Sequence, residues 1–208
     1  KHRPPVRIVG KPWLSVFPTE RSARQSGGRI DLRYLFTVED RPMPLWTCEQ
    51  CGAQFPEAAS PPSSCPICED ERQYVNWEGQ AWLTREELAQ RHRLVWRDDL
   101  GLVGIALAPS FAIGQRALLV PDRGGCVMWD CVPLATEEAI AHVKSLGGLT
   151  AIAISHPHYY GAVADWSAAF DDAPIYLHGA MEKITSYYQS RGIDLGDLRP
   201  VKGVKKAE

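Results

Sequence analysis

Two short cysteine-bearing segments organise this chain: WTCEQCG at residues 46–52 and CPIC at residues 65–68. In each, two residues separate the cysteines, which places both thiols about one turn apart and facing one point. Four thiolates are the ligand set that zinc prefers in a closed tetrahedral site. The sequence therefore predicts a structural zinc ion, and its four ligands would be Cys48, Cys51, Cys65 and Cys68.

Other chemistries of paired cysteines compete with zinc. Iron also accepts four thiolates, so the spacing leaves iron open. Disulfides would need an oxidising compartment, and we expect none because the sequence shows no apolar signal segment. A redox-active pair usually stands alone before a helix, whereas these two pairs bracket a Pro- and Ser-rich loop at 57–64. A closed site has no open coordination position, so we expect the ion to hold structure and not to catalyse.

The overall composition is that of an ordinary globular protein. The 208 residues are 45% hydrophobic and 23% charged, with a formal net charge of −2. No apolar run approaches the roughly 20 residues of a membrane helix, so we expect no membrane partner. The charge balance does not favour nucleic acid, and basic ends of a chain are usually solvated arms. Reduced thiols favour a reducing compartment, so the predicted localisation is cytoplasmic.

The pattern along the chain predicts five segments. They are a basic N-terminal segment (1–45) with a strand at 30–38, a four-cysteine zinc ribbon (46–77), a linker helix (78–98), a half domain (99–192) and a basic tail (193–208). In the linker, Thr84 and Glu87 have the spacing of a capping box, which predicts a helix from there to about His92.

From about residue 100, short apolar runs alternate with helical patterns. The predicted strands are 102–107, 116–120, 126–129, 150–154 and 174–177, and the predicted helices follow Thr136 and span about 160–170 and 179–190. Ala139, Val143 and Leu146 would form the apolar stripe of the first of these helices. The order predicts an α/β (α+β) fold, with helices on at least one face of a sheet.

A pair of histidines ends the most apolar predicted strand, in the sequence Ser155-His156-Pro157-His158. Open α/β sheets bind ligands at the carboxyl ends of their strands. Alternate residues of an extended segment face the same way, so both imidazoles can point at one site. We expect the helix that follows to keep the rings neutral through its positive end. His156 and His158 are therefore candidate ligands of a second metal ion, for which three protein ligands are the usual minimum.

Three segments resemble the metallo-β-lactamase fold hydrolases: IGQRALLV at 113–120, VMWD at 127–130 and ISHPH at 154–158. The resemblance covers about residues 100–180, so the half domain would be a partial metallo-β-lactamase-like sheet beside a rubredoxin-like ribbon. It implies hydrolysis by metal-activated water, with His156 and His158 as the first two histidines of an HxHxDH motif. It also implies that Asp130 supports these ligands without binding the ion.

The chain also departs from that motif. Tyr160 stands at the position of the motif's Asp, and Gly161 at that of its third His. Catalysis is therefore open: the protein is either a metal-dependent hydrolase with an incomplete metal site or a non-catalytic zinc-ribbon binding protein. A half domain would also leave sheet edges and an apolar face bare. We expect the C-terminal helix and tail, an unidentified partner or self-association to cover them.

Overall fold

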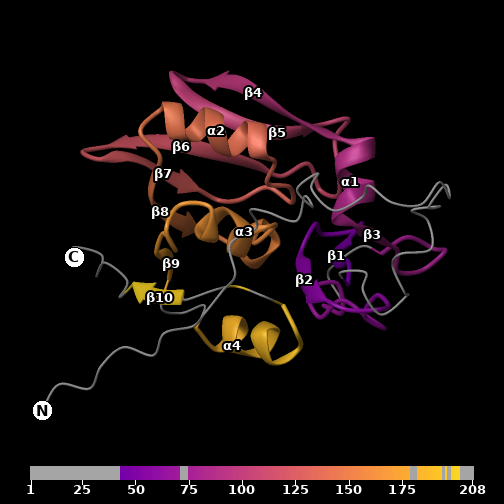
Figure 1. Ribbon diagram of the computed structural model, residues 1–208. Coiled ribbons are helices and arrows are strands. Elements are labelled where there is room, and N and C mark those ends of the chain that lie inside the picture. The colour runs from indigo at the N-terminus through magenta and orange to yellow at the C-terminus, as the bar shows by residue number, and fades with distance from the viewer. Residues whose placement is uncertain (1–42, 71–74, 179–181, 194, 196–197, 202–208) are drawn as a thin grey trace, which may run out of the picture. The chain divides into compact units, whose positions relative to one another are not determined.

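The structure is a computed structural model, and it describes residues 43–70, 75–178, 182–193, 195 and 198–201 (Figure 1). These residues belong to one compact unit. The predicted strand at 30–38 and most of the basic N-terminal segment lie outside the described residues, as does the end of the basic tail. The boundaries that we predicted between the ribbon, the linker and the half domain remain predictions.

The cysteine segment forms a three-stranded antiparallel sheet in the order β2-β1-β3. Its strands are β1 (Leu45–Cys48), β2 (Gln54–Glu57) and β3 (Trp82–Thr84). The turn between β1 and β2 carries the first cysteine pair, and Gly52 adopts the positive φ of 75° that this turn requires. The Gly52 N–H donates to the Cys48 carbonyl at 2.8 Å. Backbone hydrogen bonds thus shape the first cysteine turn.

The capping box at the start of α1 (Arg85–Arg91) is confirmed. The Glu87 N–H donates to Thr84 Oγ1 at 3.1 Å, and the Thr84 N–H donates to Glu87 Oε2 at 2.9 Å. Each bond satisfies an amide that would otherwise lack a partner at the helix start. Leu88 is the buried residue of this helix. Helix α1 therefore links the ribbon to the larger sheet with a rigid first turn.

The second sheet has seven strands in the order β10-β9-β8-β7-β6-β5-β4. The strands are β4 (Arg93–Asp99), β5 (Leu102–Ala108), β6 (Arg116–Asp122), β7 (Gly125–Trp129), β8 (Leu149–Ile154), β9 (Ile175–His178) and β10 (Leu198–Val201). Strands β4 to β7 pair antiparallel, and β7 to β10 pair parallel. The predicted mixed α/β fold class is confirmed.

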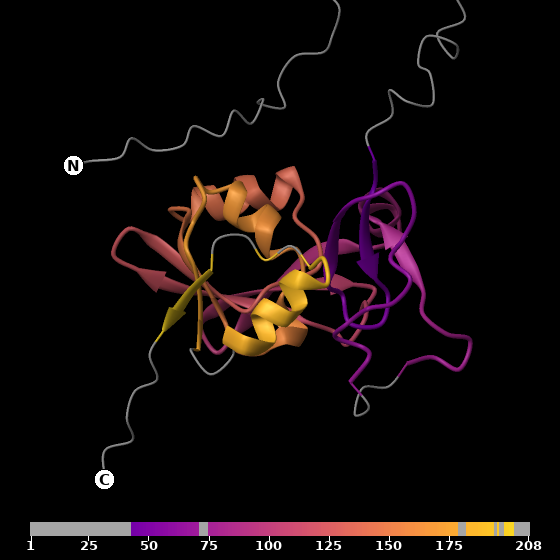
Figure 2. The same ribbon diagram turned by 90° about the horizontal axis from the view of Figure 1, so that it is seen from below.

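Helices α2 (Glu137–Ser145) and α3 (Val163–Ala168) lie on one face of the seven-stranded sheet (Figures 1 and 2). Trp166 is fully buried there, and its indole N–H donates to the Leu134 carbonyl at 3.2 Å. Between β8 and α3 lies a short 3₁₀ helix, Pro157–Tyr159, and α4 (Glu182–Ser190) connects β9 to β10. Among the described residues, every helix falls short of the length or apolarity that a membrane-spanning helix requires.

Two strands of this sheet were not predicted from the sequence. Strand β4 occupies residues that we assigned to the linker, and it forms a hairpin with β5 through Leu100 and Gly101, which have φ of 59° and 87°. Strand β10 lies within the expected basic tail and pairs with β9. The tail therefore extends the sheet by one strand, and this strand is itself an edge of the sheet.

The predicted helices are present, with two corrections. In α2, Thr136 caps the start, and Ala139 and Val143 are buried as predicted. Leu146 is the C-cap residue and is 39% exposed, so it does not belong to the apolar stripe. Helix α3 is shorter than the predicted 160–170, because Tyr160 and Gly161 belong to the loop that follows β8.

Candidate metal centre

The four cysteines of the ribbon gather at one point. Their ligand atoms all lie within 4.8 Å of one another, and all four side chains are buried. Cys48 Sγ lies 3.7 Å from Cys68 Sγ, and Cys51 Sγ lies 3.5 Å from Cys65 Sγ. The turn between the β1 and β2 strands supplies one pair. A second tight turn, in which the Cys68 N–H donates to the Cys65 carbonyl at 2.9 Å, supplies the other.

This geometry can hold a tetrahedral metal ion. With metal–sulfur bonds of about 2.3 Å, tetrahedral sulfurs lie about 3.8 Å apart. The two sulfur–sulfur distances of 3.7 and 3.5 Å are close to that value. They are much longer than a disulfide bond of about 2.0 Å, and all six cysteines of the chain are free. The donor set and its spacing therefore fit a closed metal site.

Hydrogen-bond donors favour a thiolate at Cys48. Gln80 Nε2 lies 2.9 Å from Cys48 Sγ, and the Gln50 N–H lies 3.4 Å from the same atom. The pKa of Cys48 is held well below its usual range by hydrogen bonds from neighbouring thiols. The thiol of Cys51 has the largest effect, followed by those of Cys65 and Cys68. Metal binding requires thiolates, so the remaining thiols would lose their protons as an ion binds.

A buried glutamine connects the ribbon to the loop that carries the histidines. Gln115 Nε2 donates to the carbonyl oxygens of Cys51 and His158, the latter at 3.0 Å. Both partners are carbonyls, so they fix which end of the amide faces them. In addition, the Gln54 N–H donates to the Gly161 carbonyl at 3.3 Å. The first cysteine turn and the strand after it are thus bonded to both ends of the segment from residue 158 to residue 161.

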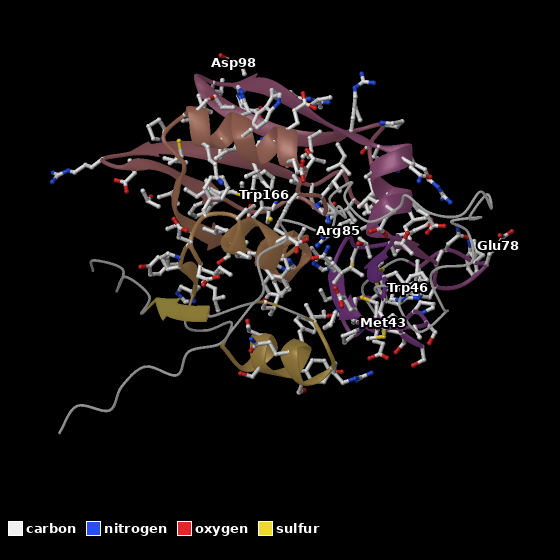
Figure 3. All side chains as sticks on the ribbon, viewed as in Figure 1. Met43, Trp46, Glu78, Arg85, Asp98 and Trp166 are labelled. Carbon is white, nitrogen blue, oxygen red and sulfur yellow. The ribbon has the colours of Figure 1, made fainter. Side chains whose placement is uncertain are left out.

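Ion pairs reinforce the contact between the ribbon and the rest of the unit. Arg85 lies at the start of α1 (Figure 3) and donates through Nη2 to Asp165 Oδ2 in α3. Arg191 Nη2 lies 3.1 Å from Glu69 Oε1, beside the second cysteine pair. Asp165 therefore has a structural role in this contact. Together the ion pairs and hydrogen bonds hold the ribbon against the larger sheet at several points.

The structure brings His156 and His158 together. Their rings are stacked with centroids 4.8 Å apart and planes inclined by 10°, and the two Nδ1 atoms are 2.9 Å apart. A 3₁₀ turn, and not the extended segment that we expected, produces this arrangement. Burial, and then the neighbouring His156, lower the pKa of His158, which favours a neutral ring. The expected cause was a helix end, but burial is the main one.

The histidine pair supplies two possible metal ligands, which is fewer than the three protein ligands of a usual metal site. Among the described residues, the cysteine cluster is the only place where three or more metal-binding side chains converge. His178 ends β9 and is exposed. Asp130 does not lie free beside the rings: its Oδ1 accepts the Ser155 N–H at 2.8 Å, and its Oδ2 accepts the Ser155 hydroxyl at 2.9 Å. Asp130 thus fixes the residue at which the histidine loop begins.

The two positions that depart from the HxHxDH motif have structural roles. The Tyr160 hydroxyl lies 2.9 Å from Thr185 Oγ1 in a buried contact between the loop and α4. Gly161 has a φ of 50°, and a Cβ atom there would lie 2.6 Å from the carbonyl carbon and oxygen of Val132. No side chain fits at this position without a shift of the backbone, so a histidine at residue 161 is sterically excluded.

Two functional contacts were absent from the sequence prediction. Gln80 is 32 residues from Cys48, and Gln115 is 64 residues from Cys51. No spacing rule connects residues so far apart. Gln80 stands in a segment without a motif, and the IGQRALLV segment that contains Gln115 assigns this residue no contact. A polar residue in the otherwise apolar entry to β6 is the one signal that could have pointed to Gln115.

A comparison with curated proteins finds a relative with significant sequence similarity to this chain. The Bacillus subtilis (strain 168) "Uncharacterized protein YmaE" is 43% identical over 139 residues, which are 65% of this chain and 50% of that protein. The chain thus spans about half the length of the curated relative that it matches. The relative's name assigns no activity. No protein-family model matches the chain.

Among solved structures, two crystal structures of DIM-1 metallo-beta-lactamase overlap partly with this one. The first has a TM-score of 0.41 and 13% identity, and it covers 54% of this chain and 51% of that chain. The second, exposed to ceftazidime, has a TM-score of 0.40 and 12% identity, and it covers 54% of this chain and 52% of that chain. At this level of similarity, membership of that family stays a proposal.

Proposed function

We propose that the chain is a zinc-binding protein in which Cys48, Cys51, Cys65 and Cys68 hold a structural zinc ion, and that the folded unit acts by binding and not by catalysis. The observation that carries the proposal is the gathering of four buried sulfur ligands within 4.8 Å of one another. Four protein ligands close the tetrahedron and leave no position for substrate or water.

The ion would support more than the ribbon itself. The first cysteine turn is bonded through Gln115 to the histidine loop, and Gln54 bonds directly to Gly161. Metal binding that orders the ribbon would therefore also order this loop. Iron would satisfy the same four sulfurs, and metal analysis with a visible absorption spectrum distinguishes the two ions.

A metal-dependent hydrolase is the second candidate, and the histidine pair favours it. The two Nδ1 atoms lie 2.9 Å apart, at hydrogen-bond distance, so an ion that bound both nitrogens would displace the proton between them. Such an ion would supply an activated water. Against this candidate, Gly161 cannot carry a third histidine, and Asp130 is engaged by Ser155. The pair would need a further ligand from elsewhere.

Zinc stoichiometry separates the two candidates. We expect one zinc per purified chain, unchanged in the double variant His156→Ala/His158→Ala, because neither residue lies in the cysteine cluster. The matched variant Cys65→Ser should lose that zinc. A second zinc that disappears in the histidine variant, together with hydrolysis that disappears with it, would reject the non-catalytic proposal. Zinc retained in full by Cys65→Ser would reject the cysteine site.

A further inference from the structure

The turn before β3 brings a glutamine to the cysteine cluster. The Gly79 N–H donates to the Asn76 carbonyl at 2.8 Å. Gly79 has a φ of 98°, a conformation that glycine adopts without steric cost. The turn ends immediately before Gln80, and the side chain of Gln80 is half-buried.

Backbone hydrogen bonds fix Gln80 beside Cys48. In the antiparallel ladder of β1 and β3, Cys48 pairs with Trp82. The Glu49 N–H donates to the Ala81 carbonyl at 3.0 Å, which joins the residue after Cys48 to the residue after Gln80. The turn on one side and the ladder on the other therefore hold the main chain at Gln80.

The amide of Gln80 donates to the sulfur of Cys48. Gln80 Nε2 lies 2.9 Å from Cys48 Sγ. A thiolate bound to a metal ion has no proton and can only accept, so the amide must present an N–H group to it and not its oxygen. The backbone N–H of Gln50 lies 3.4 Å from the same sulfur and is a second donor. Cys48 therefore receives one donor from its own turn and one from a residue 32 positions away.

The four sulfurs differ in hydrogen bonding and in exposure. Within the described residues, these two N–H groups are the only ones that donate to a sulfur of the cluster. Four thiolates around a divalent ion carry a net charge of about −2, which N–H donors partly offset. Cys48 is fully buried, whereas Cys68 is the most exposed of the four at 6%. Cys48 is thus the best stabilised of the four sulfurs, and Cys68 is the one that a reagent reaches first.

We propose that Gln80 is a positioning residue of the zinc site, which keeps Cys48 bound so that Cys48 is the last sulfur to leave the ion and Cys68 the first. This inference rests on the proposed zinc site. Donation from the amide stabilises the thiolate, because hydrogen bonds to charged groups are stronger than those between neutral groups. Residues that bond to metal ligands tune the affinity for the ion in this way.

Zinc affinity of the full chain tests the role of Gln80. Competition with a chromophoric chelator should show zinc bound about 10- to 100-fold more weakly by Gln80→Met, which has a similar volume but no N–H group. Gln80→Glu should bind zinc more weakly still, because it places a carboxylate beside the thiolate. Gln90→Met, at an exposed position in α1, is the matched control and should bind zinc as the wild type does.

The order of alkylation separates donation to one sulfur from a general loosening of the ribbon. N-ethylmaleimide adds to a sulfur that has left the ion: the sulfur–carbon bond forms as the carbon–carbon double bond opens, and the neighbouring carbon takes a proton from water. In singly modified chains at low conversion, mass spectrometry should find the label mostly on Cys68 and least on Cys48. Gln80→Met should raise the share of Cys48, whereas general loosening would raise all four cysteines together.

The outcomes that overturn this inference differ from those that overturn the zinc site. A wild-type chain that carries no zinc overturns the zinc site and this inference with it. Zinc that is bound by the wild type and equally tightly by Gln80→Met overturns the role of Gln80 alone. Label that appears first on Cys48 in the wild type also overturns that role, since the best stabilised sulfur would then be the first to leave.

Discussion

Removal of the metal from the cysteine site is expected to unfold the three-stranded sheet of the ribbon. Apparent binding free energies of structural zinc sites are about 10–16 kcal/mol, which is as large as the whole stability of a typical domain. The strands of the ribbon have three or four residues each, so their own ladder hydrogen bonds contribute little to its stability. Chelation should therefore abolish protection from hydrogen exchange over residues 45–57 and 82–84.

Cysteine variants separate loss of the ion from other effects of a chelator. Cys48→Ser and Cys65→Ser should reproduce the exchange pattern of the chelated protein, because each removes one of four ligands. Cys126→Ser is the matched control: Cys126 is also buried, but it lies in β7 outside the cluster. Full protection of β1 to β3 in the presence of a chelator that has removed the ion would contradict a structural role for the site.

The parts of the fold that the sequence predicted are those with local signals. The spacing within each cysteine pair fixes which thiols face one point, and the four sulfurs converge as that spacing indicates. The capping box at Thr84 and Glu87 concerns one helical turn, and the structure reproduces both of its hydrogen bonds. Within each cysteine pair and within the capping box the residues are three positions apart, so one short segment contains the pattern. The two cysteine pairs meet across 14 and 20 positions, and it is their shared preference for one ion that predicts this meeting.

The parts that escaped prediction depend on partners distant in the chain. Strand β10 has no apolar alternation of its own, since Arg199 and Pro200 interrupt it, and it is a strand because β9 offers an edge to pair with. Strand β4 resembles a charged linker in sequence, and its pairing with β5 makes it a strand. Tertiary context decides such segments, because an edge strand needs only one neighbour and can be polar on one face.

The histidine loop was predicted in composition but not in conformation. The sequence placed His156 and His158 at a strand end, and the structure stacks their rings through a 3₁₀ turn. It also explains the glycine at residue 161, where any side chain would collide with the backbone of Val132. A sequence pattern shows that a motif residue is missing, but only the surrounding atoms show that the position cannot hold it.

Gln115→Met is expected to loosen the contact between the ribbon and the histidine loop. Methionine has nearly the same volume but no N–H groups, so the carbonyl oxygens of Cys51 and His158 would each lose a buried donor. Leaving a buried polar group without a partner costs about 1–3 kcal/mol. Part of this cost is offset, because Gln115 Oε1 has no hydrogen-bond partner among the described residues and would be removed as well.

The net expectation is a loss of about 2 kcal/mol in the free energy of unfolding, measured by urea denaturation of the zinc-loaded chain. Hydrogen exchange should rise first at residues 158–161, because these residues depend on the glutamine and on Gln54 for their contact with the ribbon. Gln189→Met, at an exposed position in α4, is the matched control and should change neither quantity. Unchanged stability and exchange in Gln115→Met would mean that the zinc site and the histidine loop fold independently, and that the metal orders the ribbon alone.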